Sequence, residues 1–154
     1  MIINHDITYL YHILSTSLLG KNVSIQYKLN EGEFSGSIVT YMFCIGNGQF
    51  FGSNLWVNPD GIVDDGKFEV TNLGDLTFFE ILTSFPSIKK GTHHDDVEKV
   101  QKLEKITELE IKPGKNQEKD VLLVIDGELS GKCPCKISCL EKEIKIVLPK
   151  NKIK

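Results

Sequence analysis

The sequence has 154 residues, of which 40% are hydrophobic and 25% are charged, and this balance is typical of one ordinary globular domain. No apolar run approaches the roughly 20 residues that span a bilayer, and the N-terminus lacks the layout of a signal peptide, so we expect a cytoplasmic chain. All 18 basic residues are lysines and the net charge is −3, so a nucleic-acid partner, which arginine usually contacts, is not expected.

The first third of the chain contains one predicted helix and two predicted strands. Apolar residues recur at helical spacing from Ile7 to Leu18, and Gly20 can end that helix. Val23 to Leu29 alternates apolar and polar residues, which predicts a half-buried strand, and Asn30 to Gly32 predicts the turn after it. Ser37 to Ile45 is almost continuously apolar, so we expect one strand in the middle of a sheet.

The middle of the chain continues with a strand and a short helix. Lys67 to Asn72 predicts the strand, and a helix is expected from Asp75 until Pro86 ends it. Between Val97 and Ile111 the apolar residues first step by three, as in a helix, and then alternate, as in a strand. The residues alone do not decide whether the region from Val97 to Ile111 forms a helix or strands.

Two further strands complete the expected fold. Val121 to Ile125 predicts a buried strand, and Glu141 to Leu148 predicts the last one. Short strands separated by Gly and Pro turns, with one or two short helices, predict a mainly β fold, an antiparallel β-sandwich. We expect a single domain over residues 1–154.

The lysines are concentrated at the C-terminal end. From Lys132 to Lys154 there are seven lysines and two glutamates. Such an end can be merely solvated, or it can contact an anionic membrane surface, so peripheral membrane contact is an open alternative.

The cysteines predict thiols rather than a metal site. Cys133, Cys135 and Cys139 have a spacing that matches none of the common zinc layouts. Reduced thiols are the expected state in a cytosolic chain, and Cys44 lies in an apolar run that predicts a core position.

Two acidic turns carry the strongest functional signal. The first, Asp64-Asp65-Gly66, lies within the stretch Asn58-Pro59-Asp60-Gly61-Ile62-Val63-Asp64-Asp65-Gly66-Lys67-Phe68-Glu69-Val70, which follows the glycine-rich Phe43 to Gly52. The second is Asp126-Gly127-Glu128, which directly follows an apolar strand. In this order they resemble the C-terminal, lipid-binding domain of the family of diacylglycerol, sphingosine and ceramide kinases. The resemblance runs from about Thr8 to Pro149.

The resemblance implies a β-sandwich, with strands from about Leu103 onward, that forms one half of a two-domain enzyme. In the family, ATP is held on an N-terminal domain by a Gly-Gly-Asp-Gly loop, and that tetrapeptide does not occur in this sequence. We therefore expect residues 1–154 to be the substrate domain, inactive alone, with the ATP-binding domain as its partner. One departure is Gly52-Ser53-Asn54, where the family has three glycines.

The turn Asp64-Asp65-Gly66 has two interpretations. By residue type alone it is an ordinary turn, because Asp-Gly favours turns without any metal. The resemblance implies a magnesium ion held by the side chain of Asp65 and the backbone carbonyls of Ile62 and Lys67. Magnesium accepts such a mixture of carboxylate, carbonyl and water ligands. In the family this ion organises the interface between the domains.

The Asp126-Gly127-Glu128 turn is the predicted catalytic element. Phosphoryl transfer to an alcohol needs a carboxylate that takes the hydroxyl proton. The resemblance to bacterial diacylglycerol kinases implies that Glu128 is this proton acceptor, with Asp126 beside it. In sphingosine kinases the base is instead assigned to the missing Gly-Gly-Asp-Gly loop. A plain hairpin turn with two solvated acids is the alternative.

A third group, His93-His94-Asp95-Asp96, could ligate a metal by residue type, but we interpret it as a polar loop because adjacent side chains usually point apart. The leading hypothesis is an ATP-dependent lipid kinase that phosphorylates a hydroxyl of diacylglycerol or a sphingoid lipid. Its pocket walls are expected from Ser37 to Ile45, Val121 to Ile125 and the helix at Phe78 to Phe85. The alternative is a non-catalytic β-sandwich that binds a lipid or a protein.

Overall fold

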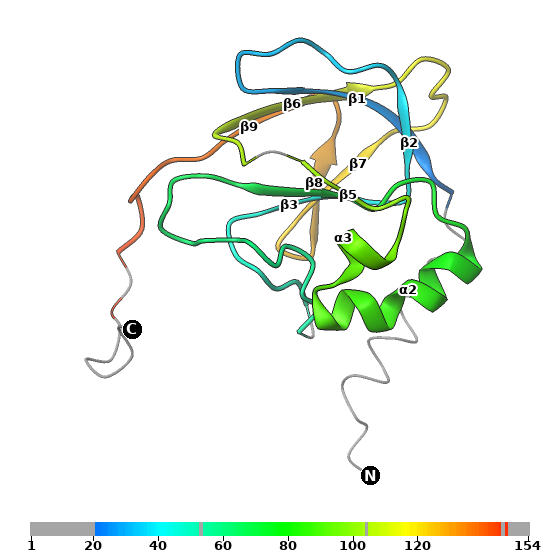
Figure 1. Cartoon of the computed structure of the whole chain (residues 1–154). Coiled ribbons are helices and arrows are strands. Elements are labelled where there is room, and N and C mark those ends of the chain that lie inside the picture. The colour runs from blue at the N-terminus through cyan, green and yellow to red at the C-terminus, as the bar shows by residue number, and fades with distance from the viewer. Residues whose placement is uncertain (1–20, 53, 104, 146, 148–154) are drawn as a thin grey trace.

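The computed structural model describes residues 21–52, 54–103, 105–145 and 147. The helix predicted at Ile7 to Leu18 lies outside the described residues. Within them, two antiparallel sheets stack on one another, and the helices α2 and α3 lie against the smaller sheet (Figure 1). The prediction of a mainly β, sandwich-like fold with antiparallel sheets and short helices is confirmed.

The larger sheet has four strands in the order β2-β1-β6-β9, all antiparallel. The smaller sheet has the order β3-β4-β5, and β7 and β8 form a separate hairpin. The strands are β1 (Val23–Leu29), β2 (Ile38–Thr40), β3 (Phe43–Gly46), β4 (Glu69–Asn72), β5 (Gln101–Lys102), β6 (Glu108–Pro113), β7 (Leu122–Ile125), β8 (Glu128–Lys132) and β9 (Cys135–Ser138). The helices are α2 (Phe78–Lys90) and α3 (His93–Asp96).

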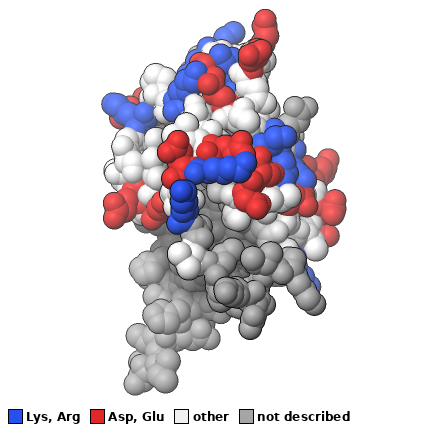
Figure 2. All heavy atoms as spheres, turned by 90° about the vertical axis from the view of Figure 1, so that its left-hand side faces the viewer, with Lys and Arg blue, Asp and Glu red and all other residues white. Residues whose placement is uncertain are grey.

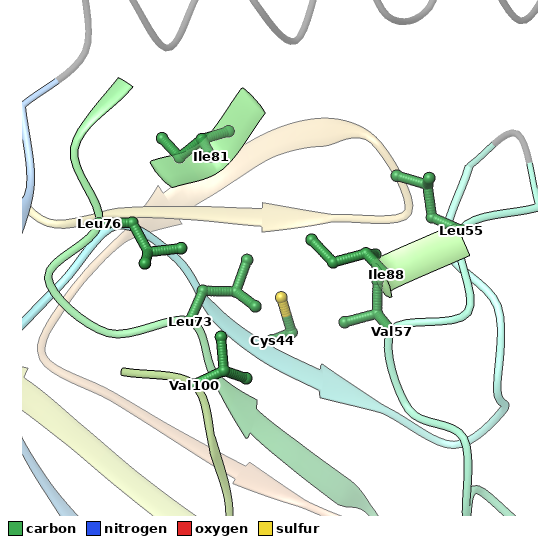
Figure 3. Close-up of a cluster of buried hydrophobic side chains, with 8 residues drawn as sticks. All are labelled: Cys44, Leu55, Val57, Leu73, Leu76, Ile81, Ile88 and Val100. Carbon is green, nitrogen blue, oxygen red and sulfur yellow. The ribbon is translucent and has the colours of Figure 1, made fainter. Parts of the chain in front are cut away.

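Two hydrophobic cores hold these layers together. The core between the sheets consists of Ile25, Val70, Ile106, Leu109, Ile111, Val121 and Cys133. The core between the smaller sheet and α2 consists of Cys44, Leu55, Val57, Leu73, Leu76, Ile81, Ile88 and Val100 (Figure 3). The core position predicted for Cys44 is confirmed, and the four cysteines are free. Because β4 lies between both cores, all four of its residues are buried.

The expected single strand from Ser37 to Ile45 is wrong, because the chain changes sheets within it. Residues Ile38–Thr40 pair with β1, whereas Phe43–Gly46 pair with β4. Between them, Tyr41 N donates to the carbonyl oxygen of Gly74 at 2.6 Å. The apolar run therefore belongs to two strands, one in each layer of the sandwich.

The predicted ends of the second helix are also wrong. Thr77, not Asp75, caps α2: the Thr77 hydroxyl accepts from Glu80 N, and the Glu80 carboxylate accepts from Thr77 N. The helix continues through Pro86 and ends at Gly91, whose φ is 72°. A proline removes one backbone hydrogen bond, and the burial of Ile81 and Ile88 on either side compensates for it.

In the C-terminal third, the strand boundaries differ from the prediction. In the region from Val97 to Ile111, the strand implied from about Leu103 onward is present as β6, and the short strand β5 lies wholly before Leu103. At Val121 to Ile125 the strand is present but mostly exposed, and only Val121 is buried. The described part of Glu141 to Leu148 contains no strand, because its apolar side chains Ile144 and Val147 are 83% and 97% exposed. The last strands are instead β8 and β9.

Candidate functional site

Asp65 lies in a turn that is closed by its own carboxylate. Asp65 Oδ1 accepts from the backbone N–H of Lys67 at 3.0 Å, and Asp65 N–H points to the Ile62 carbonyl at 3.5 Å. The second oxygen, Oδ2, lies 2.9 Å from Lys105 Nζ. The hydrogen bond from Lys105, with that from Lys67 N, lowers the pKa of Asp65. The turn thus gathers the three residues predicted as metal ligands, and it adds an ammonium group.

Glu69 is a buried carboxylate beside the same lysine. It is the first residue of β4, and its side chain is 1% exposed. Neither carboxylate oxygen has a hydrogen-bond donor among the described residues. Lys105 Nζ is 3.7 Å from Glu69 Oε1. Burial raises the pKa of Glu69, because the charged form loses its hydration.

A second acid–lysine pair extends the cluster along β5. Lys102 Nζ donates to Asp60 Oδ2, and this hydrogen bond lowers the pKa of Asp60. We call Asp60, Asp65, Glu69, Lys102 and Lys105 the acid–lysine cluster. Figure 2, which views the molecule from the left of Figure 1, shows lysine and acidic side chains interleaved across that face. The cluster contains three acids and two lysines, so its formal charge is negative.

Buried polar side chains continue behind the cluster. Thr71 Oγ1 lies 2.9 Å from Asn58 Oδ1 and 3.1 Å from the Val57 carbonyl oxygen. His94 Nε2 lies 3.1 Å from the same hydroxyl, and the tautomer of the ring sets which of the two groups donates. Burial, with the charges of His93 and Lys102, lowers the pKa of His94 to about 4. His94 is therefore neutral at physiological pH.

The predicted polar loop at His93 to Asp96 is the one-turn helix α3. His93 is fully buried, and its Nε2 lies 3.0 Å from the Val57 carbonyl oxygen. Among the described residues, no group of three or more His, Cys, Asp or Glu side chains is placed to hold a metal ion. The two histidines pack on each other with ring centroids 4.2 Å apart, which suits a structural role.

Asp126 and Glu128 lie elsewhere, at the tip of the β7–β8 hairpin. Asp126 and Gly127 have φ values of 49° and 87°, the signature of a tight hairpin turn that favours Asp-Gly. Glu128 is the first residue of β8 and pairs with Ile125. Both acids are exposed. At the other end of the hairpin, Cys133 N donates to the Val121 carbonyl oxygen at 2.8 Å, which ties it to the core between the sheets.

The hairpin exposes an unusual amount of apolar surface. Four large apolar side chains within eight positions are more than half exposed: Leu122, Val124, Ile125 and Leu129. Val124 lies opposite Leu129 across the two strands. Large exposed apolar side chains concentrated in one hairpin are typical of an interaction or ligand site.

An open hollow adjoins the acid–lysine cluster between the two sheets. It has a volume of about 460 Å³ and is lined by Tyr27, Leu29, Gly32, Glu33, Ser35, Lys102 and Leu103. Lys102 belongs to both features, so a polar group in the hollow would lie beside the cluster. Asp65, Asp126 and Glu128 do not line it.

The magnesium ligands implied by the sequence do not fit a resident cation in this arrangement. One Asp65 oxygen accepts a backbone N–H and the other is paired with the Lys105 ammonium. A magnesium ion needs at least one free carboxylate oxygen in addition to carbonyl and water ligands. Magnesium binding at Asp65 therefore stays a prediction that requires Lys105 to move.

Sequence reasoning missed most of the cluster. Asp60, Glu69, Lys102 and Lys105 were not proposed as site residues, because their contacts join segments about 40 positions apart. One signal was available: Glu69 and Thr71 are polar residues in the short strand predicted from Lys67 to Asn72. A polar side chain on a buried strand needs a partner, and that need points to a site.

Comparison with protein families gives the decisive observation. Residues 4–148 match the family described as YegS C-terminal NAD kinase beta sandwich-like domain. The chain belongs to this family. A comparison of the sequence with curated proteins gave no match.

Solved structures from Bacillus anthracis str. Sterne show the same fold. One, whose assignment as a diacylglycerol kinase is provisional, has a TM-score of 0.61 at 20% identity and covers 91% of this chain. Another, described as a diacylglycerol kinase, has a TM-score of 0.58 at 17% identity and covers 84% of this chain. This chain spans 45% of the first of these proteins and 43% of the second. Among the residues of this chain that the structure describes, no helix is long and apolar enough to cross a membrane.

Proposed function

We propose that this family domain is the lipid-binding half of an ATP-dependent lipid kinase. Such an enzyme transfers the γ-phosphate of ATP to a hydroxyl group of a diacylglycerol-like or sphingoid lipid. The family to which the chain belongs, and its fold likeness to proteins described as diacylglycerol kinases, support the reaction class. Because the chain spans less than half of those proteins, we expect it to be inactive without an ATP-binding domain.

The observation that carries this proposal is the β7–β8 hairpin. Its strands expose Leu122, Val124, Ile125 and Leu129, and its tip carries Asp126 and Glu128. Alkyl chains of a lipid would cover the apolar side chains, which gains about 25 cal/mol for each Å² removed from water. The lipid hydroxyl, at the polar end of the molecule, would then lie near the acidic tip.

In this proposal, Glu128 accepts the proton of the lipid hydroxyl as the oxygen attacks the γ-phosphorus of ATP. The bond from that phosphorus to the β,γ-bridging oxygen breaks, and ADP leaves. Asp126, two residues away in the same turn, helps to orient the hydroxyl. The tight turn fixes both backbone positions. Magnesium that accompanies ATP offsets the charge that develops on the transferred group. The ATP-binding domain would supply the nucleotide site, and the exposed hairpin is free to meet it.

The test is Glu128→Gln in the complete enzyme, with kcat measured at saturating lipid. Glutamine keeps the shape of the side chain but cannot take the proton, so we expect kcat to fall by about 10²–10⁴. The control is Glu118→Gln, an exposed glutamate in the loop before β7, which should leave kcat unchanged. A loss of only a few-fold for Glu128→Gln would remove Glu128 from the proton-transfer role.

The second candidate is a non-catalytic β-sandwich that binds a lipid or protein through the same hairpin. The geometry of the turn supports this second candidate. The positive φ angles of Asp126 and Gly127 are a sufficient reason for an Asp-Gly sequence in the turn, without a catalytic role. Two measurements on Leu129→Asp and Glu128→Gln separate the candidates: binding of the chain to vesicles that contain diacylglycerol, and turnover of the complete enzyme. A binding module needs only Leu129, whereas the kinase needs both residues for turnover.

A further inference from the structure

We propose that Lys105 is a built-in cation of the acidic turn, so that its ammonium group, and not a divalent metal ion, is the shared counter-ion of Asp65 and Glu69 in this chain. The inference concerns the chain's own residues and does not depend on kinase activity. It starts from the disagreement between the ligand set that the sequence implies and the contacts that the structure shows.

The first observation is the position of the ammonium group. Lys105 Nζ lies 2.9 Å from Asp65 Oδ2 and 3.7 Å from Glu69 Oε1, so one cation serves two carboxylates. Oxygen ligands arranged around a small positive centre are what a magnesium or calcium site offers. Lys105 is held in the short connection between β5 and β6, and Ile106 beside it is fully buried. The backbone therefore delivers the ammonium group to a defined place.

The second observation is the state of Glu69. A side chain that is 1% exposed and has no hydrogen-bond donor among the described residues is a costly group to bury. The charges of Lys102 and, next, of Lys105 oppose the rise in the pKa of Glu69 that burial causes. Lys105 Nζ lies 3.7 Å from Glu69 Oε1, whereas Lys102 is paired with Asp60. The Glu69 carboxylate thus requires a positive charge nearby, and the side chain of Lys105 supplies it.

The consequence is competition between the lysine and any divalent ion. A metal ion bound to Asp65 Oδ2 would lie within a few Å of the Lys105 ammonium, and two such cations repel each other strongly in a partly buried place. With Lys105 in position, both carboxylates already have a positive charge within 4 Å, and the turn does not gain from a metal. Without Lys105, Asp65 and Glu69 are left as a vacant anionic site.

The experiment is thermal unfolding of the 154-residue chain in EDTA, in millimolar MgCl2 and in millimolar CaCl2, at matched ionic strength. For the natural sequence we expect the same Tm in all three solutions. Lys105→Met removes the charge and keeps the length of the side chain. We expect its Tm in EDTA to fall by roughly 4–10 °C, since a buried carboxylate loses its counter-ion, and Mg²⁺ or Ca²⁺ to restore at least half of the loss.

Two controls keep the test decisive. Lys102→Met removes the other lysine of the cluster, whose partner Asp60 is 56% exposed, and its Tm should not respond to either metal. Lys105→Met combined with Glu69→Gln removes the lysine charge and the buried carboxylate together, so this double variant should regain stability in EDTA and lose the metal response.

The proposal is overturned if Mg²⁺ or Ca²⁺ raises the Tm of the natural sequence, because the metal then binds in spite of the lysine. A folded Lys105→Met variant that ignores both metals also overturns it. If Lys105→Met does not fold in EDTA, the double variant decides: a double variant as unstable as the single one contradicts the role assigned to the Lys105–Glu69 contact.

Discussion

Gly91 and Trp56 lie so close together that a β-carbon on Gly91 would come within 2.8 Å of Trp56 Cδ2. Gly91 ends α2 with a φ of 72°, which an L-residue adopts only with strain. We expect Gly91→Ala to lower the free energy of unfolding by roughly 1–3 kcal/mol, because strain and overlap act together. Urea unfolding measures the change.

Gly36→Ala is the matched control, since nothing lies within 4 Å of a β-carbon there and its φ is not in the left-handed region. Its free energy of unfolding should stay the same or rise slightly. Equal losses for the two variants would show that contact with Trp56 has no part in the effect.

The start of α2 should be sensitive to acid through Glu80. The hydrogen bond from Lys99, followed by those from Thr77, lowers the pKa of Glu80 to about 2. Because the folded pKa lies below the ordinary value of 4.5, the stabilisation is complete above 4.5 and is lost as the pH falls toward about 2. Glu80→Gln should therefore be less stable than the natural sequence at neutral pH.

The stability difference between Glu80→Gln and the natural sequence should shrink through the same pH interval, and urea unfolding at a series of pH values measures it. Glu118→Gln serves as the control, because this glutamate is exposed in a loop. A difference that stays constant down to about pH 2 would contradict the role of the Glu80 charge.

His94 should titrate far below an ordinary histidine. Burial, with the charges of His93 and Lys102, lowers its pKa from 6.5 to about 4. The unfolded chain therefore binds a proton more readily than the folded one, so this residue destabilises the fold as the pH falls from 6.5 toward 4. NMR of the ring Cε1–H should show a midpoint near 4, and a midpoint near 6.5 would mean that water reaches the ring.

Leu109 and Leu129 allow the same substitution to be compared in the buried core and on the exposed hairpin. Leu109 is fully buried between the sheets, whereas Leu129 is 67% exposed on the hairpin. Leu109→Ala should lower the free energy of unfolding by about 2–5 kcal/mol, because it leaves a cavity. Leu129→Ala should change it by less than about 0.5 kcal/mol. A large loss for Leu129→Ala would mean that the hairpin face is packed in solution.

Local patterns were good guides where one face of an element meets the core. The alternation from Val23 to Leu29 predicted β1 with its observed bounds, because the period of a strand is written in consecutive residues. The run from Ser37 to Ile45 misled, because the place where a chain leaves one sheet for another depends on a distant contact, here between Tyr41 and Gly74. Pro86 misled for a similar reason, since core packing on both sides of it sustains the helix.

For the candidate site, the sequence located the turns but not their surroundings. Asp65 and Glu128 were found because Asp-Gly turns and the order of the motifs are local properties. Whether an acid is buried is not local: Glu69 is enclosed by two layers, whereas Glu128 projects from a hairpin. The roles proposed for Asp126 and Glu128 stay predictions.

By itself the sequence determined the class of fold and the family, because hydrophobic periodicity and ordered motifs are carried by neighbouring residues. Only the tertiary structure decided which charges meet. Lys105 and Asp65 are 40 positions apart, and nothing in either segment specifies the other. They meet because β4 and β5 pair antiparallel, so that the loop before β4 and the connection after β5 lie at the same end of these two strands.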